Sequence, residues 1–253
     1  MKFARMVRDG KVADKFFVEG VRLVSELIGS NISVDFLFLS ESTLSRAHNP
    51  IELLKKRSER VFTVSDSVFP TISDTKNPQG VAAICARPKN GKEEIQERIG
   101  GSPVPRVAVL HGISNPGNLG AVLRSAEAFG IDGVIVTDKS TSPFGTTAVR
   151  GSMGAIFRMP VWSGEGFTSI VEWSKELGLV SVCAEPQAGT ELSSIDWKRG
   201  MLIVFGSEAH GLMPSETSMI SESFKIRMAP EVESLNLAVA VGIVFYESCR
   251  TVS

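Results

Sequence analysis

Residues 106–137 read RVAVLHGISNPGNLGAVLRSAEAFGIDGVIVT, and this stretch decides the fold. Two short apolar runs, Arg106–Leu110 and Gly133–Thr137, flank residues 119–129, in which apolar side chains recur every three or four positions. The runs predict two strands, and the periodic segment predicts a helix between them. A strand, a helix and a second apolar strand in this order are typical of a parallel sheet covered by helices.

The same alternation continues to the end of the chain. Further apolar runs predict strands at 179–184, Met201–Phe205 and 225–228, and further periodic segments predict helices at 167–177 and 235–250. We therefore expect an α/β fold with a parallel sheet. Ligands of such sheets bind beyond the carboxyl ends of the strands. The loops to search are those after Leu110, Thr137, Phe205 and Met228.

The first 88 residues repeat the alternation on a smaller scale. The expected elements are a helix at 16–28, a strand at 34–39, a helix at 50–58, a strand at 60–64, a helical turn at 68–73 and a strand at 80–86. Residues 89–105 are rich in proline, glycine and charge, as linkers are, and within them a short helix is possible only at 93–99. We expect a small α/β domain at 1–88, a linker at 89–105 and the parallel-sheet domain at 106–253.

The composition is that of a globular chain. Hydrophobic residues make up 43% and charged residues 22% of the 253, and the mean hydropathy is +0.11. No apolar run approaches the roughly 20 residues of a membrane helix, so no membrane partner is expected. The start lacks the apolar core of a signal peptide, which favours the cytoplasm, or an organelle if a transit peptide was removed. Three cysteines and three histidines stand in no ligand spacing, so no metal is expected.

The net charge is −1, but cations gather near the start of the chain. Six of them lie within the first 22 residues: Lys2, Arg5, Arg8, Lys11, Lys15 and Arg22. Lys55, Lys56, Arg57 and Arg60 form a second cluster. Two interpretations are open, a basic surface that contacts phosphates and ordinary solvated helix faces.

Three polar segments could carry chemistry. The first, 111–120, is rich in glycine but matches neither the dinucleotide nor the Walker fingerprint. In it Asn118 is either a helix cap or a site residue, and Arg124 lies opposite the apolar stripe of the following helix. The second segment places Glu208 in a glycine-flanked loop, where it is either solvated or functional.

The third segment precedes the apolar helix at 235–250. Ser234 and Asn236 either cap that helix or belong to a site at its start. A helix that is apolar on all sides is expected to be buried. Polar residues at its start would then lie at the edge of a covered cavity.

Taken together, these segments resemble the motifs of one family. NPGNLGAVLR at 115–124, GSEAHGL at 206–212 and SLN at 234–236 are similar, in order and spacing, to the three motifs of the SpoU/TrmH family. RGSMGAIFRMP at 150–160 also resembles a small-residue segment of that family. FFVEGVRL at 16–23 and ISDTKNPQGVA at 72–82 resemble the substrate-binding domain of its rRNA-directed members.

The resemblance implies S-adenosyl-L-methionine-dependent methylation of a ribose 2'-hydroxyl in RNA, most often rRNA, within the SPOUT superfamily. It also implies a deep trefoil knot and a homodimer whose active site is assembled across the interface. By motif match, the polar active-site residues are Asn118, Arg124, Glu208, Ser234 and Asn236. The residues expected to hold the cofactor are Gly206, Ile226, Leu235, Thr137 and Met228.

The protein's task in such a transfer is to hold the ribose hydroxyl in line and to help to remove its proton. Arg124 is the base in proposals for the family, but a guanidinium is protonated at neutral pH and is a poor base. Our hypothesis is that Arg124 binds the adjacent phosphate and stabilises charge developing on the 2'-oxygen. Glu208 and Asn236 are expected to orient the loop and the substrate.

Three alternatives stay open at this point. The same chemistry could act on tRNA, and a catalytically inactive RNA-binding or ribosome-assembly factor could keep the fold. A nucleotide-dependent oxidoreductase using the glycine-rich loop is the third. It is disfavoured because the G-x-G-x-x-G fingerprint and the acidic ribose partner are missing.

Overall fold

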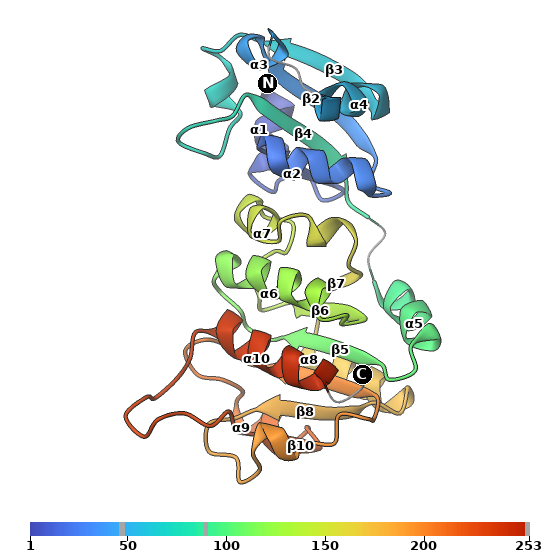
Figure 1. Cartoon of the computed structure of the whole chain (residues 1–253), viewed down its shortest axis with the longest axis vertical. Coiled ribbons are helices and arrows are strands. Elements are labelled where there is room, and N and C mark those ends of the chain that lie inside the picture. The colour runs from blue at the N-terminus through green and yellow to red at the C-terminus, as the bar shows by residue number, and fades with distance from the viewer. Residues whose placement is uncertain (46–48, 89–90, 251–253) are drawn as a thin grey trace. The chain divides into compact units, whose positions relative to one another are not determined.

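The computed structural model describes residues 1–45, 49–88 and 91–250. The chain divides into two compact units, Met1–Lys89 with Phe144–Arg158 and Asn90–Pro143 with Met159–Ser253. We call them the first and the second unit and describe each by itself (Figure 1). No helix within the described ranges has both the length and the apolar character that crossing a membrane requires.

The second unit is built on a six-stranded sheet in the order β10-β8-β9-β5-β6-β7, and all neighbouring strands run parallel. The strands are β5 (Arg106–Leu110), β6 (Gly133–Thr137), β7 (Val161–Glu165), β8 (Val180–Ala184), β9 (Met201–Phe205) and β10 (Glu222–Phe224). Every residue of β6 and β9 is buried, as expected for strands covered on both faces. The α/β fold with a parallel sheet is confirmed.

Helices cover both faces of this sheet. They are α5 (Lys92–Gly101), α6 (Pro116–Ala128), α8 (Phe167–Glu176), the short α9 (Pro214–Thr217), α10 (Leu237–Arg250) and the 3-10 turn η4 (Leu192–Ser194). On one face Ile95 of α5 and Trp173 of α8 pack in the same cluster as Val204. Phe205 points the other way and meets Phe245 of α10, with ring centroids 5.9 Å apart. α10 also packs along α6 (Figure 1).

The first unit contains a four-stranded sheet in the order β1-β4-β2-β3. β4 runs antiparallel to β1 and β2, whereas β2 and β3 are parallel. The strands are β1 (Lys15–Glu19), β2 (Val34–Ser40), β3 (Ser58–Val64) and β4 (Val81–Ala86). The helices are α1 (Lys2–Arg8), α2 (Val21–Glu26), α3 (Glu41–Ser45), α4 (Asn49–Arg57) and α7 (Thr146–Gly151), with 3-10 turns η1 (Leu27–Gly29), η2 (Phe69–Thr71) and η3 (Ala155–Phe157).

Residues 144–158 belong to the first unit although they lie within the range that the sequence assigns to the C-terminal domain. The ring of Phe16 lies 5.6 Å from that of Phe144 and 6.0 Å from that of Phe157. Arg150 pairs with Asp74 at 3.1 Å. Apolar and ionic contacts together hold this segment in the first unit.

Two predicted elements were wrong. Residues 16–19, expected to begin a helix, form part of strand β1, and all four are buried. An amphipathic helix would leave one side of this stretch exposed, so complete burial is the reason a strand forms instead. The last strand, expected at 225–228, is β10 at Glu222–Phe224. The apolar side chains of Ile226 and Met228 line a pocket rather than extending the strand.

Candidate functional site

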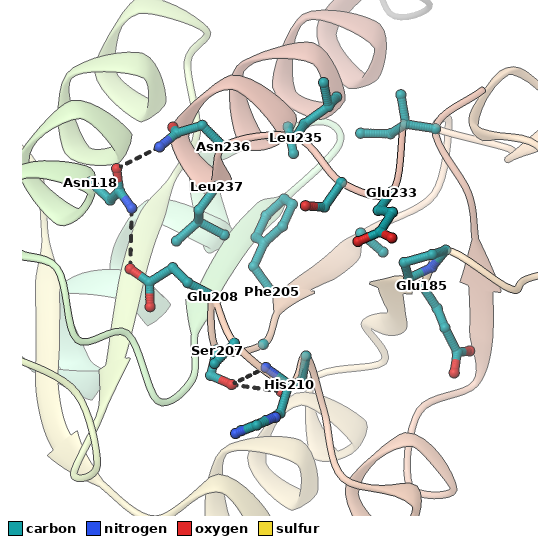
Figure 2. Close-up of a pocket in the computed structure, with 18 of the residues that line it drawn as sticks. Asn118, Glu185, Phe205, Ser207, Glu208, His210, Glu233, Leu235, Asn236 and Leu237 are labelled. Atoms are coloured by element: carbon teal, nitrogen blue, oxygen red, sulfur yellow. Dashed lines mark hydrogen bonds between the residues drawn. The ribbon is translucent and has the colours of Figure 1, made fainter. Parts of the chain in front are cut away.

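A pocket of about 820 Å³ lies where β8 and β9 end, in the second unit (Figure 2). Its lining comes from four stretches that are far apart in the sequence, within 114–118, 184–186, 205–211 and 226–240. Loops at the carboxyl ends of parallel strands are where α/β folds bind their ligands. The pocket therefore lies where the sequence directed the search.

Glu208 joins the loop after β9 to the start of helix α6. Its Oε2 accepts hydrogen bonds from the Ser114 N–H at 3.1 Å and the Ser114 hydroxyl at 3.3 Å. Its Oε1 accepts from the Asn115 N–H at 3.3 Å. Asn115 in turn caps the helix, since its side-chain oxygen accepts from the Gly117 N–H at 2.8 Å. The carboxylate thus fixes the chain just before α6.

A chain of side-chain hydrogen bonds connects the three motif segments (Figure 2). The Asn236 amide donates to Asn118 Oδ1 at 3.1 Å, and the Asn118 amide donates to Glu208 Oε1 at 3.2 Å. Asn236 Oδ1 also accepts from the Ala238 N–H at 2.9 Å, at the start of α10. Asn236 thus caps α10, whereas the cap of α6 is Asn115 and not Asn118. Both Asn118 and Asn236 line the pocket, and their roles there stay predictions.

The Glu208 carboxylate is held in its ionised form. Desolvation raises its pKa, but hydrogen bonds from the Ser114 N–H, the Asn118 amide and the Asn115 N–H outweigh this effect, so the pKa lies below its ordinary value. A carboxylate that already accepts several hydrogen bonds is poorly placed to take up a substrate proton. Its contacts favour a positioning role.

Gly206 is required by the turn that follows β9. A Cβ at this position would lie 2.2 Å from the carbonyl carbon of Gly211. This distance is too short for a non-bonded contact, so any residue other than glycine would force the loop to move. The turn is closed by two backbone hydrogen bonds between Ser207 and Gly211, at 2.9 and 3.1 Å. Gly211 itself has φ +64, a conformation that glycine adopts at low cost.

The structure brings together most of the residues that the sequence predicts for the site. Those that line the pocket are Asn118, Gly206, Glu208, Ile226, Met228, Ser234, Leu235 and Asn236. Arg124 is not among them. It is exposed on α6, six residues after Asn118, and its guanidinium makes no hydrogen bond or ion pair with any residue of the described ranges.

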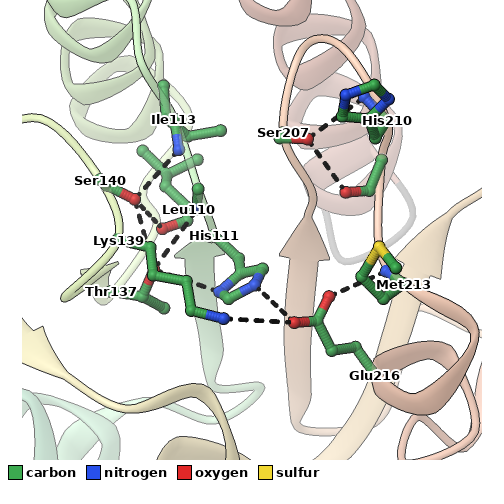
Figure 3. A network of polar contacts seen from close by, with 12 residues as sticks. Leu110, His111, Ile113, Thr137, Lys139, Ser140, Ser207, His210, Met213 and Glu216 are labelled. Atoms are coloured by element: carbon green, nitrogen blue, oxygen red, sulfur yellow. Dashed lines mark hydrogen bonds and ion pairs between the residues drawn. The ribbon is translucent and has the colours of Figure 1, made fainter.

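Thr137 is also absent from the lining and lies in a buried network beside the pocket (Figure 3). Its hydroxyl is 3.2 Å from His111 Nδ1 and 3.3 Å from the Ser140 hydroxyl. His111 Nε2 lies 2.9 Å from Glu216 Oε1, and its ring packs on Phe167. The network ties the ends of β5 and β6 to α9.

Glu216 is the acidic member of this network. Desolvation raises its pKa, but the Met213 N–H, the facing His111 and Lys139 at 4.0 Å outweigh that effect and leave the pKa below its ordinary value. The sequence does not reveal this pair, because residues 105 positions apart share no local pattern.

The lining also includes residues that the sequence analysis missed. Glu185 and Glu233 add two carboxylates to that of Glu208, and His210 lies on the turn after β9 (Figure 2). Glu185 directly follows β8. The expectation that ligands bind beyond the carboxyl ends of the strands would have identified it if the loop after β8 had been included. Glu233 carries no signal beyond its proximity to Ser234.

The pocket is negatively charged. It holds three glutamates, and none of its described lining residues is a lysine or an arginine. A cationic ligand of moderate size would therefore be favoured over an anionic one.

Within the part of the chain that the structure describes, no three His, Cys, Asp or Glu side chains are grouped to hold a metal ion.

Comparisons with known proteins agree with this arrangement. The family model of the SpoU rRNA Methylase family matches residues 105–246, and that of the MRM3-like substrate binding domain matches residues 6–83. An uncharacterised tRNA/rRNA methyltransferase of Synechocystis is 32% identical over 80% of this chain and 72% of its own. The 23S rRNA (guanosine(2553)-2'-O)-methyltransferase RlmP of Bacillus subtilis is 26% identical over 91% of this chain and 87% of its own.

Among solved structures, the AdoMet-bound rRNA methyltransferase from Sinorhizobium meliloti superposes with a TM-score of 0.84. The superposition covers 100% of this chain and 94% of that one, at 25% identity. The fold and the pocket thus define an α/β RNA methyltransferase with a substrate-binding unit. The chain belongs to the SpoU rRNA methylase family.

Proposed function

We propose that the protein transfers the methyl group of S-adenosyl-L-methionine to a ribose 2'-hydroxyl of RNA, with rRNA as its substrate. The observation that carries this proposal is the Asn236–Asn118–Glu208 chain, because it joins the three motif segments around one pocket. We also propose that the enzyme works in the cytoplasm and that its second unit has the trefoil knot typical of its family.

The pocket fits the cofactor in charge and size. S-adenosyl-L-methionine has a sulfonium and an ammonium against a single carboxylate, and the pocket offers three glutamates. A volume of about 820 Å³ is within the usual range for a cofactor of this size. Gly206, Ile226, Leu235 and Met228 would hold it, Gly206 because it leaves backbone groups accessible. When bound, the cofactor supplies a methyl group on a good leaving group.

The residues of this chain position the acceptor and stabilise its charge. Asn118 and Asn236 offer amide groups at the pocket wall, and Glu208 keeps Asn118 in place. Arg124, whose guanidinium is free of partners among the described residues, would bind the phosphate next to the acceptor ribose and stabilise charge developing on the 2'-oxygen. Ser234 lies at the pocket wall within reach of the same space.

Arg124 does not line the pocket, and this supports a homodimer. Val239, Ile243 and Tyr246 form an exposed apolar stripe on α10, at the i, i+4 and i+7 spacing of one helix face. We propose that a second copy packs on this stripe and brings its own α6 to the first pocket. The active site would then be completed by Arg124 of the second copy.

rRNA is favoured over tRNA because the first unit matches a substrate-binding domain and because the relative RlmP acts on 23S rRNA.

The experiment that tests the function has two parts. Isothermal titration calorimetry would measure S-adenosyl-L-methionine binding, with NAD as the control ligand. Mass-spectrometric mapping of 2'-O-methyl groups in cellular rRNA and tRNA, with and without the protein, would identify the acceptor. A protein that binds the cofactor but changes no site would be an inactive assembly factor.

A further inference from the structure

Exposed phenylalanine rings gather on one face of the first unit. Phe62, on strand β3, is 41% exposed, and Phe3, on helix α1, is 42% exposed. The ring of Phe36, on strand β2, lies between them and is only partly buried. We call Phe3, Phe36 and Phe62 the aromatic platform.

The rings of the platform are held in a defined arrangement. Phe36 lies 5.8 Å from Phe3, edge to face, and 6.0 Å from Phe62. Phe62 stacks on the buried Phe38, with centroids 5.5 Å apart and planes inclined by 17°. The buried Phe38 thus supports the ring of Phe62, which remains 41% exposed to solvent.

The sheet register places a cation on the same face. Phe36 is paired with Arg60 and Phe38 with Phe62 across β2 and β3, so Arg60 and Phe62 project to one side of the sheet. β3 is an edge strand of this sheet, next to β2 alone (Figure 1). The side chain of Arg60 is exposed and makes no hydrogen bond or ion pair with any described residue.

Helix α1 adds further positive charge beside Phe3. It carries Lys2, Arg5 and Arg8 and no carboxylate. Arg8 is used within the unit, where it donates to the Ser73 carbonyl at 3.0 Å. The side chains of Lys2 and Arg5 are exposed and make no hydrogen bond or ion pair with any described residue.

We infer that the aromatic platform binds unpaired RNA bases by stacking, while Lys2, Arg5 and Arg60 bind the neighbouring phosphates. Bases splayed out of a helix stack on aromatic side chains of sheet surfaces, and cations beside the rings hold the backbone. This inference rests on the proposed function, and it adds which surface holds the substrate and that the bound segment is single-stranded.

A second copy of the chain is a poorer occupant of this face. Two platforms brought together would oppose the same three free cations, which repel each other. RNA offers flat bases that can stack on the aromatic rings. Its phosphates supply the negative charge that complements the three cations. Charge complementarity therefore selects RNA.

The test compares two substitutions on one strand. Phe62→Leu keeps apolar bulk over Phe38 but removes the ring, and Val61→Leu changes a residue that is 40% exposed on the opposite face of β3. The probes are a 20-nucleotide RNA without internal pairing and the same strand in duplex with its complement, with binding measured by fluorescence anisotropy. We expect Phe62→Leu to weaken binding of the single strand about tenfold and Val61→Leu to leave it unchanged.

A third variant gives a direct signal of stacking. All three tryptophans of the chain, Trp162, Trp173 and Trp197, lie in the second unit. Phe62→Trp introduces an indole on the platform, whose fluorescence should be quenched by the single strand and much less by the duplex. The Trp variant should keep the affinity of the wild type.

Each outcome decides the inference separately from the proposed function. Equal affinity of wild type, Phe62→Leu and Val61→Leu, or no quenching in Phe62→Trp, overturns it even if rRNA methylation proceeds. A change in sedimentation caused by Phe62→Leu without loss of RNA affinity would assign the face to a second copy and overturn it as well. Absence of S-adenosyl-L-methionine binding in the wild type would refute the proposed function, whatever the platform binds.

Discussion

The side-chain amide of Asn118 lies 3.2 Å from Glu208 Oε1, although 90 residues separate them in the chain. This bond connects the start of α6 with the loop after β9, and Asn236 extends it to α10. Three loops that could move independently are therefore coupled by side chains. This coupling explains why polar residues at the starts of α6 and α10 also line the pocket.

Replacing Glu208 tests this coupling. Glu208→Gln keeps the shape but places an amide group against the donors of Ser114 and Asn115, so we expect a loss of about 1–2 kcal/mol in unfolding free energy and weaker cofactor binding. Urea denaturation and calorimetry measure the two effects. The control is Glu233→Gln, which removes a pocket charge without breaking a hydrogen bond described in the structure. Identical behaviour of both variants would show that only charge matters.

Arg124→Lys tests the proposed role of the guanidinium. Lysine keeps the charge but cannot form two parallel hydrogen bonds with a phosphate. We expect kcat to fall by about 100-fold, a loss typical of a missing charge-stabilising donor. The Kd of S-adenosyl-L-methionine should not change, because Arg124 does not line the pocket. Full turnover by Arg124→Lys would rule out the two-bond contact.

Gly206→Ala should abolish cofactor binding. The added Cβ would meet the backbone of Gly211 at 2.2 Å and push the turn into the pocket. The matched control is Gly100→Ala in helix α5, where a Cβ meets nothing within 4 Å and should stabilise the helix by about 0.5–1 kcal/mol. If Gly206→Ala binds S-adenosyl-L-methionine like wild type, this turn does not shape the site.

The pH dependence of stability should reflect Glu208 and Glu216. The pKa of each is lowered in the folded state, from an ordinary value of 4.5. Their contribution is therefore complete above about pH 4.5 and is lost as the pH falls through the lower folded pKa. In Glu216→Gln, the melting temperature should therefore fall less steeply as the pH is lowered below 4.5 than in the wild type. Glu172→Gln, which replaces an exposed carboxylate without a described partner, should not change this slope.

Ile243→Glu tests the homodimer. A carboxylate in the apolar stripe of α10 would have to be buried at the interface, so we expect monomers in sedimentation velocity and loss of methyl transfer. The control is Leu177→Glu, at the end of α8, where leucine has nearly the same exposure. A dimer that survives Ile243→Glu would require a different interface.

Much of the second unit could be predicted from sequence because its strands are buried on both faces. Continuous apolar runs such as Met201–Phe205 have few other interpretations. The polar loops after these runs could be assigned to the site because the carboxyl ends of parallel strands meet at the same edge of the sheet. The fold and family are confirmed, while the roles of the individual site residues stay predictions.

The errors arise where local pattern and tertiary contact disagree. Phe17 shares a helical spacing with Val21, Val24 and Ile28, but residues 16–19 are completely buried and form part of strand β1. Ile226 and Met228 look like strand residues and instead face the pocket. The pairing of His111 with Glu216 depends on two distant segments meeting, which no local window contains.

The membership of residues 144–158 in the first unit has a consequence for how the protein is made. During synthesis the N-terminal part emerges from the ribosome early, but Phe16 has neither Phe144 nor Phe157 to pack against until residue 158 has followed. When residue 158 has been synthesised, strands β5 and β6 of the six-stranded sheet have been made and β7 to β10 are still to follow. The first unit is thus completed out of order, and it cannot be exchanged between relatives as one uninterrupted cassette.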